Sequence, residues 1–112
     1  MPQTIALIGA MPPEISLLQE SLQNLRSEHM ADFDIYCGEY AGKNVVLALS
    51  GIGKVNAALS TALVLQQHRP DFVINTGSAG GLGSGLKVGD VVIGTQTAHH
   101  DVDVTAFGYA IG

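Results

Sequence analysis

The sequence predicts an α/β protein with three layers: a mostly parallel central sheet that carries an antiparallel hairpin, with helices on both faces. Short continuous apolar runs, typical of strands buried on both faces, stand at residues 4–8 and 72–75. Apolar residues recur at helical spacing between these runs, and strands separated by helices favour right-handed crossovers in a parallel sheet. With 112 residues, the chain has the size of a single domain.

The amino-terminal region supplies a strand, a helix and a hairpin. Thr4–Ile8 is the expected first strand. A helix is expected from about Pro13 to Arg26, because prolines are tolerated in a first turn and leucines recur behind them at helical spacing. The β-rich segments 33–37 and 44–49 flank a turn at Gly42-Lys43, which predicts an antiparallel hairpin.

The region after the hairpin supplies a helix and two strands. A helix that ends before Pro70 is indicated by apolar residues at helical spacing, namely Val55, Ala58, Leu59, Ala62 and Leu65. The strand Phe72–Asn75 then runs into a glycine-rich loop, and a further strand is expected at Val91–Ile93. Three segments, 9–14, 50–54 and 76–81, follow the carboxyl ends of strands, where parallel sheets bind their ligands.

The composition excludes several classes of protein. Apolar residues make up 46% of the chain and charged residues 13%, which excludes disorder and indicates faces that further protein covers. A formal charge of -5 without any basic run argues against a nucleic-acid or membrane partner, and no apolar stretch is long enough to span a bilayer. A single cysteine, Cys37, and the lack of a basic leader indicate a cytoplasmic protein without internal disulfides.

Two polar side chains are the candidates for chemistry. Ser78 is the one hydroxyl at the apex of the glycine-rich loop, and Glu14 stands in the first turn of the first helix. Without a catalytic role, Ser78 would simply belong to a flexible turn, and Glu14 would be a surface carboxylate that complements the helix dipole. If both side chains converge on one cavity, they can hold and deprotonate a water molecule, as general-base hydrolysis requires.

Other motifs predict no further chemistry. Gly51-Ile52-Gly53-Lys54 lacks the Ser or Thr of a phosphate loop and the third glycine of a dinucleotide fingerprint. The segment His99–Asp103 offers potential metal ligands, but adjacent side chains of an extended segment point to opposite faces, so no metal is expected there. Cys37 has no base beside it in the sequence and is expected to be a small core residue.

Five strings of this sequence carry a family resemblance. They are Ile8-Gly9-Ala10-Met11 with Glu14, Ser50-Gly51-Ile52-Gly53-Lys54-Val55, Asn75-Thr76-Gly77-Ser78-Ala79-Gly80-Gly81, Lys87-Val88-Gly89-Asp90 and His100-Asp101-Val102-Asp103-Val104-Thr105-Ala106-Phe107-Gly108-Tyr109. In their order and with near-identical spacing, they resemble the bacterial 5'-methylthioadenosine/S-adenosylhomocysteine nucleosidase family. The resemblance runs the length of the chain and implies irreversible hydrolysis of an N-glycosidic bond to adenine and a 5-thioribose derivative, with no cofactor.

The resemblance also implies a role for each candidate residue. Glu14 takes the place of the family's water-activating glutamate, and Ser78 helps to position the same water. Members of the family contact the ribose, the 5'-alkylthio group and the purine of their nucleoside. The implied contacts are Met11 and Ile52 at the ribose and 5' region, Ala79 and Gly80 against the purine, and Val104 and Phe107 closing the 5' pocket of the partner in a homodimer.

The chain reaches only to Gly112, roughly half the family's usual length. We therefore expect a partial domain that corresponds to the amino-terminal half of a nucleosidase. The family's ribose-gripping methionine and glutamate, and the aspartate that protonates adenine, are expected outside it. Because an unprotonated adenine would be a poor leaving group from an oxocarbenium-like state, the 112-residue chain is predicted to be inactive by itself.

Two other functions remain open from the sequence. A purine or uridine nucleoside phosphorylase would use phosphate in place of water, but its arginines would fall where this chain has Pro12-Pro13-Glu14 and Asn75. A non-catalytic nucleoside-binding module could use the same pocket. Binding that is indifferent to Glu14→Gln, with no hydrolysis to lose, would identify such a module.

Overall fold

A computed structural model describes residues 2–110 of the chain, which divide after Ala79 into two compact units. The first unit contains a five-stranded sheet in the order β2-β3-β4-β1-β5. Its elements are β1 (Thr4–Gly9), α1 (Pro12–Ser21), β2 (Gln23–Met30), β3 (Phe33–Tyr40), β4 (Lys43–Leu49), α2 (Lys54–His68) and β5 (Phe72–Asn75).

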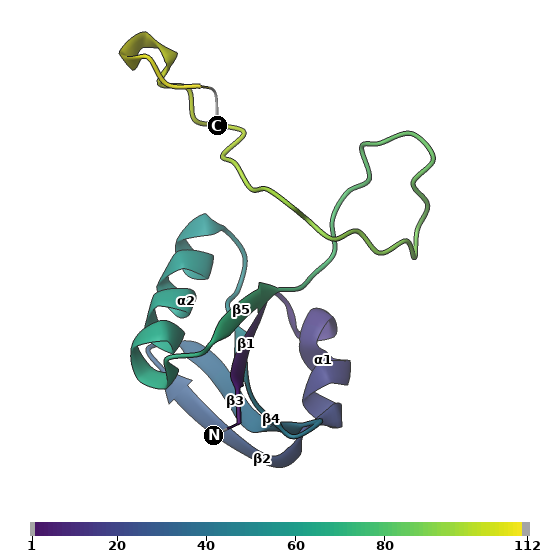
Figure 1. Ribbon diagram of the computed structural model, residues 1–112, viewed down its shortest axis with the longest axis vertical. Coiled ribbons are helices and arrows are strands. Elements are labelled where there is room, and N and C mark those ends of the chain that lie inside the picture. Colours follow the sequence, from purple (N-terminus) through teal and green to yellow (C-terminus); the bar gives the residue numbers. More distant parts are fainter. Residues whose placement is uncertain (1, 111–112) are drawn as a thin grey trace. The chain divides into compact units, whose positions relative to one another are not determined.

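The sheet is parallel on one side and antiparallel on the other. β1 pairs in parallel with both β4 and β5, whereas β3 pairs antiparallel with β2 and β4. The α1 and α2 helices lie on opposite faces of this sheet (Figure 1). The predicted α/β class, with a central sheet between two helical layers, is confirmed.

The core follows the alternation of side chains along the strands. On the face covered by α2, alternate positions of three strands pack with one helix residue: Ala6, Ile8, Ile35, Cys37, Val46, Ala48 and Val64. The intervening residues Val45 and Leu47 point to the other face, where Ile15 is the buried residue of α1. Cys37 is therefore a core residue, as the sequence indicated.

The predicted first helix is too long, and one strand was missed. α1 ends at Ser21, and Gln23–Met30 forms the edge strand β2 against β3. Leu22 and Leu25 continue the helical spacing, but Asn24 adopts a left-handed backbone with φ 54° at the start of the strand. Pairing with β3 therefore overrides a helical pattern that local spacing alone favours.

The second helix is confirmed, but its buried face differs from the expected one. The stripe that faces the sheet is centred on Ser60 and Val64, both fully buried. The predicted apolar positions, including Val55, Leu59 and Leu65, lie on the outer face and are exposed. No helix among the described residues has the length and apolar character to cross a membrane.

The second unit has little regular structure. Its one helical element in the described residues is the 3-10 turn η1 (Thr105–Phe107). The strand predicted at Val91–Ile93 is wrong, because these residues pair with no strand among the described residues and are largely exposed. An apolar β-rich run becomes a strand only where a neighbour completes the hydrogen-bond ladder, and no strand between Gly80 and Ala110 does so.

Candidate active site

The carboxyl ends of the three parallel strands meet, as the sequence predicted. The Ser50 N–H donates to the Gly9 carbonyl at 2.8 Å, and the Thr76 N–H donates to the Ile8 carbonyl at 2.9 Å. These bonds continue the ladder past the last residues of β4 and β5. The turns that follow β1, β4 and β5 therefore start from one end of the sheet.

Glu14 is fixed at the start of α1 by its own helix. Pro12 and Pro13 open the helix, where the lack of an N–H costs no hydrogen bond because the first N–H groups of a helix have no partner within it. Glu14 occupies the third helical position, and its N–H donates to the Met11 carbonyl at 3.0 Å. In return, the Met11 N–H donates to Glu14 Oε1 at 2.9 Å, which holds the carboxylate over the helix terminus.

The turn after β5 brings Ser78 to the same carboxylate. The Ser78 N–H donates to Glu14 Oε2 at 2.6 Å, and the Ser78 hydroxyl donates to the same oxygen at 3.0 Å. The two residues are 64 positions apart in the chain. The structure therefore joins the two side chains that the sequence selected, through direct hydrogen bonds.

The close approach of Glu14 depends on Gly77, a glycine whose role the sequence did not reveal. A Cβ added to Gly77 would lie 2.6 Å from Glu14 Oε2 and 3.2 Å from its Cδ, closer than side-chain atoms pack. Gly9 has a similar effect beneath α1, since a Cβ there would overlap Ile15 Cγ2. The glycine content of both turns was the available signal, but only the fold shows which glycine faces the carboxylate.

Hydrogen bonds keep the Glu14 carboxyl group ionised. The Ser78 N–H lowers the Glu14 pKa most, followed by the Ser78 hydroxyl. Desolvation raises the pKa by less than either, and the N–H groups of Met11 and Ala10 lower it slightly further. The positive end of the α1 dipole favours the same charge. Glu14 is thus an anion at neutral pH, able to accept a proton.

This arrangement suits the binding and activation of one water molecule. Because the Ser78 hydroxyl donates to Glu14, the lone pairs of its oxygen are left to accept a hydrogen from water. Glu14 Oε1 accepts from Met11 and retains a further acceptor position. A water between the two side chains could donate one hydrogen to each, which is the geometry that a general base requires.

The other predicted contact residues are divided between the two units. Met11 caps α1 beside Glu14, whereas Ile52 projects from the β4–α2 turn with 73% of its surface exposed. Ala79 is the last residue of the first unit. The remaining three, Gly80, Val104 and Phe107, belong to the second unit, where the Phe107 side chain is exposed.

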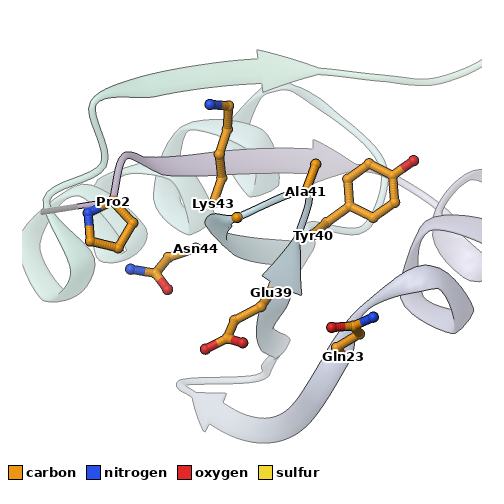
Figure 2. Close-up of a pocket in the computed structure, with 8 residues that line it drawn as sticks. Pro2, Gln23, Glu39, Tyr40, Ala41, Lys43 and Asn44 are labelled. Atoms are coloured by element: carbon orange, nitrogen blue, oxygen red, sulfur yellow. The ribbon is translucent and has the colours of Figure 1, made fainter.

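A hollow of about 280 Å³ lies elsewhere on the first unit, around the β3–β4 turn (Figure 2). Tyr40, Lys43 and Asn44 line it together with Gln23 and Glu39. None of the predicted site residues contributes to it. Glu14 is half-buried and Ser78 is exposed, so the pair lies at the surface of the first unit, away from this hollow.

Comparison with known proteins supports the resemblance. The family profile described as the phosphorylase superfamily matches residues 4–112. The 5'-methylthioadenosine/S-adenosylhomocysteine nucleosidase of Bacillus subtilis strain 168 is 56% identical over 108 residues, which are 96% of this chain and 47% of the relative. The chain spans about half the length of the curated relatives it matches.

Solved structures of nucleosidases are also similar to this chain in sequence and in fold. The nucleosidase of Neisseria meningitidis in complex with methylthio-immucillin-A is 65% identical, with a TM-score of 0.96 over 98% of this chain and 48% of that one. The nucleosidase of Colwellia psychrerythraea in complex with adenine is 46% identical, with a TM-score of 0.96 over the whole of this chain and 46% of that one. Sequence, fold and family profile together show that the chain belongs to the phosphorylase superfamily.

Proposed function

We propose that this chain is the amino-terminal half of a 5'-methylthioadenosine/S-adenosylhomocysteine nucleosidase. The observation that carries the proposal is the Glu14–Ser78 pair, which joins the turns after β1 and β5 at one end of the sheet. Relatives that share this fold were solved with methylthio-immucillin-A and with adenine, which supports a nucleoside as the ligand.

In the proposed reaction, Glu14 accepts a proton from water while the water oxygen bonds to the anomeric carbon of the ribose. The bond between that carbon and the purine nitrogen breaks, and its electron pair leaves with adenine. Ser78 orients the water by accepting its second hydrogen. An acid must protonate the departing adenine, and we assign that acid to the remaining half of the protein. The 112-residue chain by itself is therefore expected to be inactive.

The substrate contacts follow from the same proposal. Met11 and Ile52 contact the ribose and the 5'-alkylthio group, while Ala79 and Gly80 lie against the purine. In a homodimer, Val104 and Phe107 close the 5' pocket of the partner, which would cover apolar side chains that are exposed in the second unit. The unpaired Cys37 supports a cytoplasmic location, and the reaction proposed needs no cofactor.

Phosphorolysis is the nearest alternative within the superfamily. The two turns that hold Glu14 and Ser78, residues 10–14 and 76–79, contain no Lys or Arg. A phosphate placed there would meet the Glu14 anion and no cation from these turns. Water is therefore the better nucleophile for this site.

The test uses a joined protein, in which residues 1–112 are continued by the second half of the Neisseria meningitidis nucleosidase. We expect it to release adenine and free 5-methylthioribose from 5'-methylthioadenosine in phosphate-free buffer, whereas the 112-residue chain releases neither. Products are identified by chromatography and mass spectrometry. A sugar 1-phosphate formed only with added phosphate, or a folded joined protein without turnover, would contradict the proposal. Adenine release by the chain alone would contradict its expected inactivity.

A further inference from the structure

A second cluster of reactive side chains lies in the first unit. Glu28 of β2, Cys37 of β3 and His68 in the last turn of α2 bring a carboxylate, a thiol and an imidazole together. α2 leads from the carboxyl end of β4 to the amino end of β5, so its last turn lies at the opposite end of the sheet from Ser78 (Figure 1). The cluster is therefore separate from the Glu14–Ser78 pair.

The donor atoms of the cluster are close to the spacing of metal ligands. Cys37 Sγ lies 3.3 Å from Glu28 Oε1 and 4.0 Å from His68 Nε2, and His68 Nε2 lies 3.4 Å from Glu28 Oε2. In a tetrahedral zinc site with bonds of about 2.0–2.3 Å, ligand atoms stand about 3.3–3.6 Å apart. Small side-chain rotations would bring one atom of each residue to that spacing.

The surroundings combine a buried thiol with an accessible rim. Cys37 is only 3% exposed, whereas the side chains of His68 and Glu28 are 18% and 37% exposed. Glu28 stands on β2, the edge strand of the sheet, so an ion could reach the thiol past this edge. Arg26, opposite Cys37 in the β2–β3 register, adds a positive charge, and the Glu28 carboxylate offsets it.

We propose that Glu28, Cys37 and His68 bind a Zn²⁺ ion, with a fourth ligand position open to water. A sulfur, a nitrogen and an oxygen donor are the set that a borderline-soft cation such as Zn²⁺ prefers. The ion ties the edge strand β2 and its neighbour β3 to the end of α2, and so stabilises the packing of these elements. Binding displaces the thiol proton of Cys37 to solvent.

Cobalt titration tests this site directly. Co²⁺ is added to the purified 112-residue chain, followed by displacement with Zn²⁺. We expect one equivalent to give the intense visible absorption of tetrahedral cobalt and a thiolate-to-cobalt charge-transfer band. Zn²⁺ should abolish both signals and raise the melting temperature. A folded chain that takes up no Co²⁺, or that gives no thiolate band, would overturn the proposal.

Variants assign the ligands. Cys37→Ser should abolish the thiolate band, and His68→Gln should weaken Zn²⁺ binding at least about tenfold, as should Glu28→Gln. Because Cys37 is buried, the two rim variants provide the test if the serine variant fails to fold. The matched control is His29→Gln, which removes an exposed histidine of the same edge strand that pairs with Asp34. Binding that is unchanged in His68→Gln, or equally weakened in His29→Gln, would overturn the assignment.

Discussion

Replacing Glu14 by glutamine in the joined protein is expected to lower kcat by about 10²- to 10⁴-fold, the range that general-base catalysis supplies. Glutamine keeps the shape of the side chain but cannot accept the proton of the attacking water. Its carbonyl oxygen can still accept the two Ser78 donors, but its amide nitrogen would then face the Met11 N–H, a donor against a donor. Because the substitution removes the base but keeps the shape of the side chain, the loss should appear in kcat with a smaller change in KM.

The matched control for this prediction is Glu20→Gln, the same change on an exposed side chain of α1. It should leave kcat within about twofold of the parent protein, since Glu20 has no place in the proposed reaction. Ser78→Ala should lose less activity than Glu14→Gln, because the Ser78 N–H still holds the carboxylate. Full activity in Glu14→Gln would remove Glu14 from the mechanism.

Gly77→Ala is expected to reduce kcat/KM of the joined protein by about 100-fold, the loss that a misplacement of roughly 1 Å can cause. The added Cβ would stand 2.6 Å from Glu14 Oε2, so the carboxylate must swing away from the turn. That movement breaks its hydrogen bonds to the Ser78 N–H and hydroxyl. The backbone of Gly77 is not in the left-handed region, so the effect comes from the lack of space beside the carboxylate.

Gly94→Ala is the control for this substitution, because a Cβ at Gly94 meets no atom within 4 Å and the backbone there is unstrained. Steady-state kinetics and a thermal melt of both variants separate a displaced carboxylate from a general loss of stability. We expect Gly77→Ala to melt close to the parent protein while losing activity. Parent-like kinetics in Gly77→Ala would show that Glu14 is not held where the structure places it.

The local pattern of apolar residues predicted those elements in which these residues form a continuous run or recur at helical spacing. β1, β4 and β5 are continuous apolar runs, and α2 carries apolar residues at helical spacing, so their existence follows from the sequence. β2 could not be found in this way, because its exposed edge position places few apolar residues in a period of two. Its pairing with β3 is a tertiary effect that no local window contains.

The buried face of α2 shows the same limit. Both stripes of the helix carry apolar residues, and only the packing of Val64 against the sheet shows which stripe is inside. Conversely, Val91–Ile93 has the composition of a strand but lacks a partner among the described residues.

The pairing of Glu14 with Ser78 was predictable, because both residues follow strands of the parallel sheet. Glu14 and Ser78 lie 64 residues apart, yet each follows a recognisable strand, and parallel strands end at the same edge. The Glu28–Cys37–His68 cluster has no such signal. Its members come from two antiparallel strands and the end of a helix, and the histidine is 31 residues from the cysteine. Only the register of β2 on β3 and the placement of α2 bring them together.

The central claim is that Ser78 holds the Glu14 carboxylate as an anion at the end of the sheet, and a carbon-13 NMR titration of the Glu14 carboxyl group tests it most directly. The 112-residue chain suffices for this measurement. We predict a pKa below that of an ordinary glutamate, with a higher pKa in Ser78→Ala, because the serine N–H and hydroxyl are the main causes of the shift. Since the pKa is lowered by folding, the stability that Glu14 contributes is present above the unfolded-state pKa and is lost as the pH falls through the folded-state pKa. A Glu14 pKa at or above the ordinary value, unchanged in Ser78→Ala, would contradict the account.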